Sequence, residues 1–340
     1  MKQYQIFAVL AAFGAMLILA GCSKDNVNAP GPAQGDVEAM KFMIENSDSV
    51  AAFSMSEEFS IDDEGTQNSS YDVLAGAAVE PQIVSSVASD SSRPMKWGRR
   101  IFWDQIVRDY HVEMSGDTLA TVSVTKTIPG QFWVAWGMRT SAGVVFDTLV
   151  KKPFSEETKR NFLFKRIGRN AELRRNWIPV ALTMVQGQSQ GESAFSIASL
   201  SVAESRFGFD TTVTDPLNTW FRFGFRHHGC IPTFPVRDTV TVQVTITSAD
   251  DSAEVVYLRH GIGWDGRIRR RAAFELVSTT GGPGNYTRVY ERKFVTELGS
   301  WFYVARFNAV VDAFSHGSIY DKAAPFDNEF WGAPYMVARY

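Results

Sequence analysis

The sequence is poor in cysteine and has almost no excess charge. Only two cysteines, Cys22 and Cys230, occur among 340 residues, which excludes a scaffold built on disulfides. The 34 basic and 37 acidic side chains leave a formal charge of −3, so there is no overall attraction to nucleic acid. The longest apolar run, near the N-terminus, is shorter than the roughly 20 residues of a membrane-spanning helix. A polytopic membrane protein is therefore excluded, and the 45% hydrophobic content indicates a folded chain.

The first 22 residues predict export to the cell envelope. Lys2 precedes an apolar run of fifteen residues, Ile6–Ala20, which has the length of a signal-peptide core. The run ends in Leu19-Ala20-Gly21-Cys22, and this segment resembles the lipobox of bacterial lipoproteins at all four positions. The alternative is an ordinary secretory leader that contains a cysteine by chance.

The resemblance implies lipidation at Cys22. Residues 1–21 would be removed as a signal peptide, a diacylglyceryl group would join the Cys22 thiol, and the new amino terminus would be acylated. Two or more acyl chains hold a protein stably on a membrane. Ser23 stands where retained inner-membrane lipoproteins often have Asp, so the resemblance favours the outer membrane. Residues 22–35 are polar and rich in Pro and Gly, which predicts a flexible tether.

Residues 36–215 predict a module of helices and antiparallel strands. Val37, Met40, Met43 and Ile44 have helical spacing, so we expect a short helix over residues 36–46 and a weaker one ending at Phe59. The strands that we expect to follow are Tyr110–Met114, Ala120–Ile128, Gln131–Trp136, Val144–Val150, Arg160–Ile167, Trp177–Val185 and Phe195–Val202. Helices followed by an antiparallel meander indicate an α+β layer.

This order is similar to the NTF2-like (cystatin-like) cone, in which helices pack into a curved sheet. The strand–turn–strand segment Val112–Thr127 and an aromatic strand before Trp177 carry the resemblance. What it implies is a cavity, because members of that fold often hold a small ligand in the cone.

Residues 216–340 predict an all-β module. Val240–Thr247 alternates between apolar and polar residues, which is typical of a half-buried strand. With Pro235 ahead of it, this strand resembles an early strand of bacterial immunoglobulin-like domains. Further expected strands are Glu254–Arg259, Arg267–Val277, Tyr286–Val295 and Trp301–Ala313. The expected architecture is therefore α+β followed by all-β, with helices on a curved antiparallel sheet and then an immunoglobulin-like β-sandwich.

Two short motifs match enzyme signatures but lack the structural context that those signatures need. Gly187–Gly191 fits G-x-S-x-G with Ser189 as the nucleophile, yet the following residues predict a strand where the nucleophile elbow requires a helix. Gly261–Gly266 fits G-x-G-x-x-G, yet the alternating residues after it also predict a strand. We expect a polar hairpin loop at the first motif and a glycine turn that exposes Trp264 at the second.

The best metal candidates are His227, His228 and Cys230, whose imidazole and thiolate groups suit zinc or copper. No second spaced pair accompanies them, and adjacent residues of a strand point to opposite faces. We therefore expect no metal and no cofactor. If Cys22 is lipidated, Cys230 has no partner in the chain, and we expect its thiol to be buried.

Residues 151–180 hold nine basic and three acidic side chains. A solvated sheet face accounts for this run, and the alternative is a patch for an anionic envelope partner. The patch would consist of Lys159, Arg160, Lys165, Arg166, Arg174 and Arg175. Trp264, Trp331 and Tyr335 also have two interpretations: packing in the core or at the terminus, which we favour, or exposed stacking on a sugar or a protein.

Taken together, these patterns predict a lipid-anchored protein of the cell envelope, in the outer membrane, that binds or scaffolds an envelope protein or glycan without catalysis. One alternative is a small-molecule or glycan-binding module that uses an NTF2-like cavity or exposed aromatic rings. A second alternative is an envelope hydrolase with Ser189 as its nucleophile. No nucleic-acid partner is expected.

Overall fold

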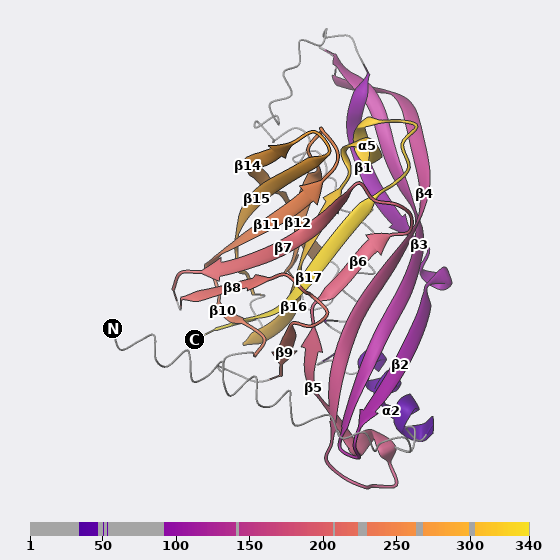
Figure 1. Ribbon diagram of the computed structural model, residues 1–340, viewed down its shortest axis with the longest axis vertical. Coiled ribbons are helices and arrows are strands. Elements are labelled where there is room, and N and C mark those ends of the chain that lie inside the picture. The colour runs from indigo at the N-terminus through magenta and orange to yellow at the C-terminus, as the bar shows by residue number, and fades with distance from the viewer. Residues whose placement is uncertain are drawn as a thin grey trace.

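Two β-sheets and a few short helices make up the computed structural model (Figure 1). The described residues are 34–46, 50, 53, 92–140, 143–206, 208–223, 230–262, 268–298 and 303–339. The helices are α2 (Gln34–Asn46), η1 (Trp103–Gln105), η2 (Leu173–Arg175) and α5 (His316–Tyr320). The strands are β1 (Arg93–Ile101), β2 (Val107–Ser115), β3 (Leu119–Thr140), β4 (Gly143–Arg166), β5 (Trp177–Thr183), β6 (Val185–Ser189), β7 (Phe195–Glu204), β8 (Phe209–Val213), β9 (Trp220–Arg222), β10 (Thr233–Pro235), β11 (Thr239–Ser248), β12 (Val255–Ile262), β13 (Ile268–Ala273), β14 (Glu275–Gly282), β15 (Asn285–Val295), β16 (Val304–Phe314) and β17 (Asn328–Ala338).

The larger sheet has 12 strands, and its main path runs β1-β3-β4-β6-β17-β16-β12-β13. It curls until the two ends of this path meet. The guanidinium carbon of Arg271 on β13 lies 3.6 Å from the ring centroid of Trp97 on β1 and 3.9 Å from that of Tyr257 on β12. Trp97 also packs on Phe314 of β16, with ring centroids 5.0 Å apart. The inner faces of β1, β3 and β4 therefore close over those of β12, β13 and β16.

The smaller sheet has five strands in the order β14-β15-β11-β7-β8, and it covers the outer face of β16 and β17 (Figure 1). β11 alternates strictly between buried and half-exposed residues over most of its length, as the apolar–polar alternation of Val240–Thr247 predicts. Its buried residues join one apolar core with residues of β16 and β17, among them Val311 and Trp331. β17 is buried on both faces along nearly its whole length, because it lies between the smaller sheet and the interior of the curled sheet.

The mostly β architecture, the curved antiparallel sheet and the first helix are confirmed. α2 spans Gln34–Asn46 and buries Met40 and Ile44, two residues of the predicted apolar face. It is held by Asp36, which accepts a hydrogen bond of 2.9 Å from Trp177 Nε1 and pairs with Arg166. Most of the second predicted helix lies outside the described residues. No described helix is long and apolar enough to cross a membrane.

The predicted break at Pro129 and Gly130 is wrong, because β3 runs straight through both residues. Pro129 lies where the neighbour of β3 changes from β1, which ends opposite Gly130, to β2, which starts opposite Thr127. The Pro129 carbonyl accepts a hydrogen bond from Phe102 N on that side, so the missing N–H of proline falls in the gap between two partners. Gly130 is needed there, since a Cβ would lie 2.5 Å from the Arg100 carbonyl oxygen.

Two further strand boundaries differ from the prediction. Val144–Val150 and all but the last residue of Arg160–Ile167 belong to one strand, β4, which has 24 residues and pairs with β3 along nearly its whole length. Arg267–Val277 is not one strand, because β13 pairs with β12 in the larger sheet while β14 pairs with β15 in the smaller sheet. Each sheet draws strands from both sides of residue 215. β17 pairs with β6 in the larger sheet, and β7 pairs with β11 in the smaller sheet.

Candidate functional site

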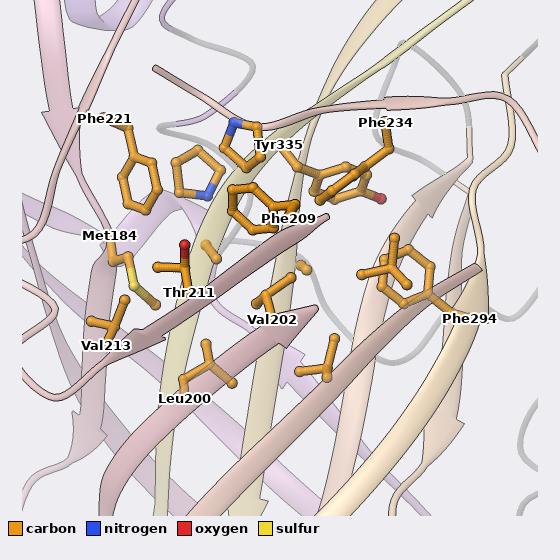
Figure 2. Close-up of a pocket in the computed structure, with 16 residues that line it drawn as sticks. Met184, Leu200, Val202, Phe209, Thr211, Val213, Phe221, Phe234, Phe294 and Tyr335 are labelled. Atoms are coloured by element: carbon orange, nitrogen blue, oxygen red, sulfur yellow. The ribbon is translucent and has the colours of Figure 1, made fainter. Parts of the chain in front are cut away.

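An apolar pocket lies between the smaller sheet and the outer face of β16 and β17 (Figure 2). Its volume is about 30 Å³, which is enough for a small apolar group and below the roughly 300–1,000 Å³ that is typical of sites for drug-sized ligands. The residues that line it are Met184, Leu200, Val202, Phe209, Thr211, Val213, Phe221, Pro232, Phe234, Val240, Val242, Phe294, Ala309, Ala333, Pro334 and Tyr335. None of these side chains is charged.

Strand alternation and two small side chains create this space. Leu200 and Val202 on β7, like Val240 and Val242 on β11, are two residues apart and therefore face the same side. On the opposite wall, Ala309 of β16 is paired directly with Ala333 of β17. Because both of these side chains are single methyl groups, the wall is recessed where larger residues would otherwise fill the core.

Aromatic rings close one side of the pocket. Figure 2 shows the rings of Phe221, Phe209, Tyr335 and Phe234 in a row above the aliphatic side chains of β7 and β8. The Phe209 and Phe234 rings meet edge to face with centroids 5.6 Å apart, and the Phe234 and Tyr335 centroids are 6.1 Å apart. Such pairs hold the rings in fixed orientations, so this wall is preformed.

The mouth of the pocket lies at β8, an edge strand of the smaller sheet. Phe209 and Thr211 of β8 are half-buried, whereas Val213 at the inner end is buried. Thr211 and Tyr335 supply the hydroxyl groups of the lining. With so few polar groups, the pocket suits an apolar molecule or the hydrocarbon part of an amphiphile, because an unpaired polar group would be costly to bury there.

A second notable cluster is a layer of buried charges inside the curled sheet. Arg99 of β1 forms an ion pair with Glu156 of β4, and both side chains are fully buried. Asn328 of β17 donates to Glu156 Oε1 at 2.9 Å and to Asp312 Oδ1 at 3.3 Å. Arg259 pairs with Asp312 at 3.1 Å. This network links five of the strands that surround the interior, β1, β4, β12, β16 and β17, and its burial favours a structural role.

Burial shifts the ionisation of this layer. Desolvation raises the pKa of Glu156, and it outweighs the attraction of Arg99. Desolvation alone would lower the pKa of Arg99, but Glu156 and Asp312 together reverse that effect and raise it. Arg99 therefore stays charged, and the carboxyl group of Glu156 is the one that holds a proton more readily than usual.

Ser189 is not placed as a hydrolase nucleophile. It ends β6, and residues 190–194 lead directly into β7 without a helix. The expected hairpin loop is wrong, because β6 belongs to the larger sheet and β7 to the smaller one. Its hydroxyl donates to Asp327 Oδ1 and to the Asn328 carbonyl oxygen, each at 3.3 Å, and accepts from Asn328 N at 3.0 Å. Among the described residues, the hydrogen-bond partners of this hydroxyl are Asp327 and the main chain of Asn328, and the helix that the nucleophile elbow requires does not follow it.

The structure does not bring the six predicted basic residues together. Arg160 is buried inside the curled sheet, where it donates to the Phe53 carbonyl oxygen and, at 3.3 Å, to Asn308 Oδ1. Its neighbour Lys159 points to the opposite face and pairs with Glu157 at 2.6 Å. The pleat of β4 explains this difference, because successive side chains alternate between the two faces. An exposed patch that includes Arg160 is therefore wrong.

The other four predicted basic residues lie near the end of β4. Arg166 pairs with Asp36, and Arg175 pairs with Glu172 at 2.7 Å. The guanidinium carbon of Arg174 lies 3.5 Å from the ring centroid of Phe42. Lys165 is exposed.

The aromatic candidates that the structure describes are buried. Trp331 is 2% exposed and Tyr335 is 3% exposed, because β17 is covered on both faces. Exposed stacking on a sugar is therefore wrong for these two residues, and the core packing that we favour is confirmed. Trp331 donates to Glu329 Oε1 at 2.9 Å, and Tyr335 lines the pocket. Trp264 lies outside the described residues.

The predicted metal ligands and the lipidation site are largely outside the described part of the chain. His227, His228 and Cys22 fall in undescribed segments. Cys230 is a free cysteine and is partly exposed, so the prediction of a buried thiol is wrong. Its backbone forms an isolated bridge to Arg222 and belongs to no strand. Among the described residues, no three His, Cys, Asp or Glu side chains are grouped to hold a metal ion.

Comparison with known protein families, curated proteins and solved structures finds no match to this chain.

The pocket was not predicted from the sequence. The apolar faces of Phe195–Val202 and Val240–Thr247 were visible as core positions. The space between them depends on Ala309 being opposite Ala333, and that pairing register cannot be read from the order of residues alone.

Proposed function

We propose that this chain is a lipid-anchored envelope protein that binds, without catalysis, an apolar ligand in the pocket between its two sheets. The ligand class is a small apolar group, such as the terminal segment of a lipid acyl chain. The observation that carries the proposal is the lining, whose 16 residues provide no charge (Figure 2). Burial of each methylene group contributes about 0.8 kcal/mol, so an apolar chain gains affinity from this surface without a polar anchor.

The anchor in this proposal comes from the lipobox-like segment Leu19-Ala20-Gly21-Cys22 and the polar residues after it. Outer-membrane location follows from Ser23 by the same resemblance. The NTF2-like and immunoglobulin-like descriptions of residues 36–215 and 216–340 rest on sequence patterns. The pocket does not distinguish between these descriptions, because residues from both segments line it.

A scaffolding role for a protein or glycan partner is the second candidate. The hydrolase alternative has no support from the surroundings of Ser189. The glycan version of binding loses two of its three predicted contacts, because Trp331 and Tyr335 are buried.

Two neighbouring threonines of β8 provide a matched test. Thr211 lines the mouth of the pocket, whereas Thr212 lies on the opposite face, is exposed, and has its hydroxyl 2.7 Å from that of Ser201. Thr211→Trp places an indole in the mouth, and Thr212→Trp places the same group in solvent. Residues 23–340, which retain every described element, are purified without detergent and titrated with a fluorescent fatty acid.

We expect the parent chain and Thr212→Trp to bind the fatty acid equally, and Thr211→Trp to lose most of that binding. Native mass spectrometry of the same samples would show an added ligand mass only on the two binding-competent proteins. Equal binding by all three proteins would locate the ligand elsewhere and contradict the proposal. No binding by any of them would favour the scaffolding role.

A further inference from the structure

One end of the molecule, which we call the basal end, gathers exposed apolar side chains next to basic ones. It consists of α2 and residues 165–178, which include η2 and the start of β5 (Figure 1). Its exposed apolar residues are Phe42 at 39%, Ile167 at 59%, Leu173 at 38% and Ile178 at 39%. Apolar residues that are exposed as a group on one surface mark a site of interaction.

The segments of the basal end touch one another. Arg174 of η2 stacks on Phe42 of α2, and a Cβ at Gly35 would meet the side chain of Leu173 at 2.4 Å. Across the β4–β5 pair, Lys165 lies opposite Ile178. Arg166 and Trp177, the next pair along these strands, contact Asp36 of α2, so Lys165 and Ile178 lie on the opposite face of the sheet. The apolar and basic groups therefore adjoin one another on both sides of the same end of the molecule.

The acidic groups of this end are already engaged. Asp36 is covered by Arg166 and Trp177, Glu38 pairs with Lys41 at 3.2 Å, and Glu45 accepts a 2.6 Å hydrogen bond from the Tyr110 hydroxyl.

Three cations of the basal end have no such neutralising partner. Within the described part of the chain, Lys165, Arg169 and Arg174 have no carboxylate at ion-pair distance, unlike Arg166 and Arg175. The basal end thus presents free positive charge beside its apolar groups.

The position of this end relative to Cys22 identifies the partner. α2 begins at Gln34, twelve residues after Cys22, and twelve residues reach at most about 43 Å even when fully extended. The 24 residues of β4 extend over about 80 Å at roughly 3.3 Å per residue. An anchor at Cys22 therefore keeps the basal end near the bilayer, while the far end of the β3–β4 hairpin lies a strand length away.

We propose that the basal end rests on the membrane that holds the lipid anchor. Its apolar side chains lie at the level of the headgroups, and Lys165, Arg169 and Arg174 contact the phosphates of anionic phospholipids. This inference rests on the lipid anchor of the proposed function, and it is independent of the ligand pocket. It gives the molecule a fixed orientation, with the long hairpin directed away from the bilayer.

The test uses the full lipidated chain in vesicles that contain phosphatidylglycerol and a quencher attached to the lipid headgroup. An environment-sensitive fluorophore is attached at Ile167→Cys or at the matched control Leu149→Cys. These positions are 59% and 55% exposed; Ile167 directly follows β4, and Leu149 lies in the first third of that strand. The unsubstituted chain, which has Cys230, gives the background, and vesicle flotation reports the anchor separately.

We expect the label at position 167 to be quenched and the label at position 149 to remain unquenched. Replacement of Lys165, Arg169 and Arg174 by Gln should reduce the membrane-contacting population by about fivefold per charge removed. Replacement of three distant exposed cations, Lys151, Lys293 and Arg100, by Gln should leave it unchanged.

If the chain floats with the vesicles but the labels at both positions are quenched equally, or the label at position 167 is not quenched, the inference is overturned. The lipid anchor would still be supported by the flotation. Quenching at position 167 that is the same on pure phosphatidylcholine would overturn the contact with anionic lipid. Self-quenching between labels at position 167 without lipid quenching would assign the surface to a second copy of the chain. Absence of flotation would contradict the anchor and, with it, this inference.

Discussion

The buried ion pair between Arg99 and Glu156 makes a strong prediction about stability. Arg99→Met keeps much of the side-chain volume but leaves Glu156 fully buried without its cation. Removal of one partner of a buried pair costs about 3–5 kcal/mol, which is a large part of the 5–15 kcal/mol that is typical of folded domains. The remaining carboxyl group would take up a proton, as the upward shift of the Glu156 pKa already favours.

The same strand supplies the control. Glu157, the next residue of β4, pairs with Lys159, and these two side chains are 36% and 51% exposed. Lys159→Met should cost at most about 1 kcal/mol, because exposed pairs contribute little. The double variant Arg99→Met with Glu156→Leu should recover most of the lost stability, since it removes both buried charges.

Guanidinium unfolding, followed by tryptophan fluorescence and by circular dichroism, measures these differences. Trp97 reports on the curled sheet directly, because it packs near this layer on β1. A loss of less than 1 kcal/mol for Arg99→Met, or a double variant as unstable as the single one, would refute the assignment of a buried, charged pair.

Three further predictions test the packing, the ionisation and the docking of α2. Gly187→Ala places a Cβ 2.2 Å from the ring of buried Phe330 and should lower the free energy of unfolding by about 1–3 kcal/mol, so an unchanged denaturation midpoint would contradict this packing. Burial raises the pKa of Glu329 from the ordinary value of 4.5, so the stability that this carboxyl group contributes is fully present below 4.5 and is lost as pH rises through the folded-state pKa. Glu329→Gln should flatten that part of a thermal unfolding profile, and a parallel shift of the whole curve would disprove the assignment. Asp36→Ala removes the carboxylate that binds Trp177 and should cost about 1.5–3 kcal/mol, seen as faster proteolysis within α2, whereas an unchanged cleavage rate would show that other contacts hold the helix.

Local periodicity predicted much of the secondary structure. The alternation of Val240–Thr247 gives β11, and the helical spacing of Met40 and Ile44 gives α2. The strands expected over Ala120–Ile128 and Gln131–Trp136 are continuous through Pro129, because the effect of a proline depends on whether a neighbouring strand needs its N–H. Pro129 faces the gap between the end of β1 and the start of β2. This gap arises from the tertiary arrangement of the strands, so the residues next to Pro129 in the sequence do not predict it.

The arrangement of the strands was less accessible. β7 pairs with β11, about 40 residues later in the chain, and β6 pairs with the last strand, β17. Such long-range pairing depends on which apolar faces meet, and many faces in this β-rich sequence are equivalent by pattern. The candidate site was inaccessible for the same reason, since its wall needs Ala309 and Ala333 in register. The burial of Arg160 was hidden because its partners, among them Asn308, are distant in sequence.

The central proposal is that the pocket binds the apolar end of a hydrocarbon chain. The decisive measurement is a titration of residues 23–340 with saturated fatty acids of increasing length. Since each buried methylene contributes about 0.8 kcal/mol, affinity should rise about fourfold per methylene until the pocket is full, and this rise should disappear in Thr211→Trp. An affinity that does not depend on chain length, or a rise that persists in Thr211→Trp, would contradict the account.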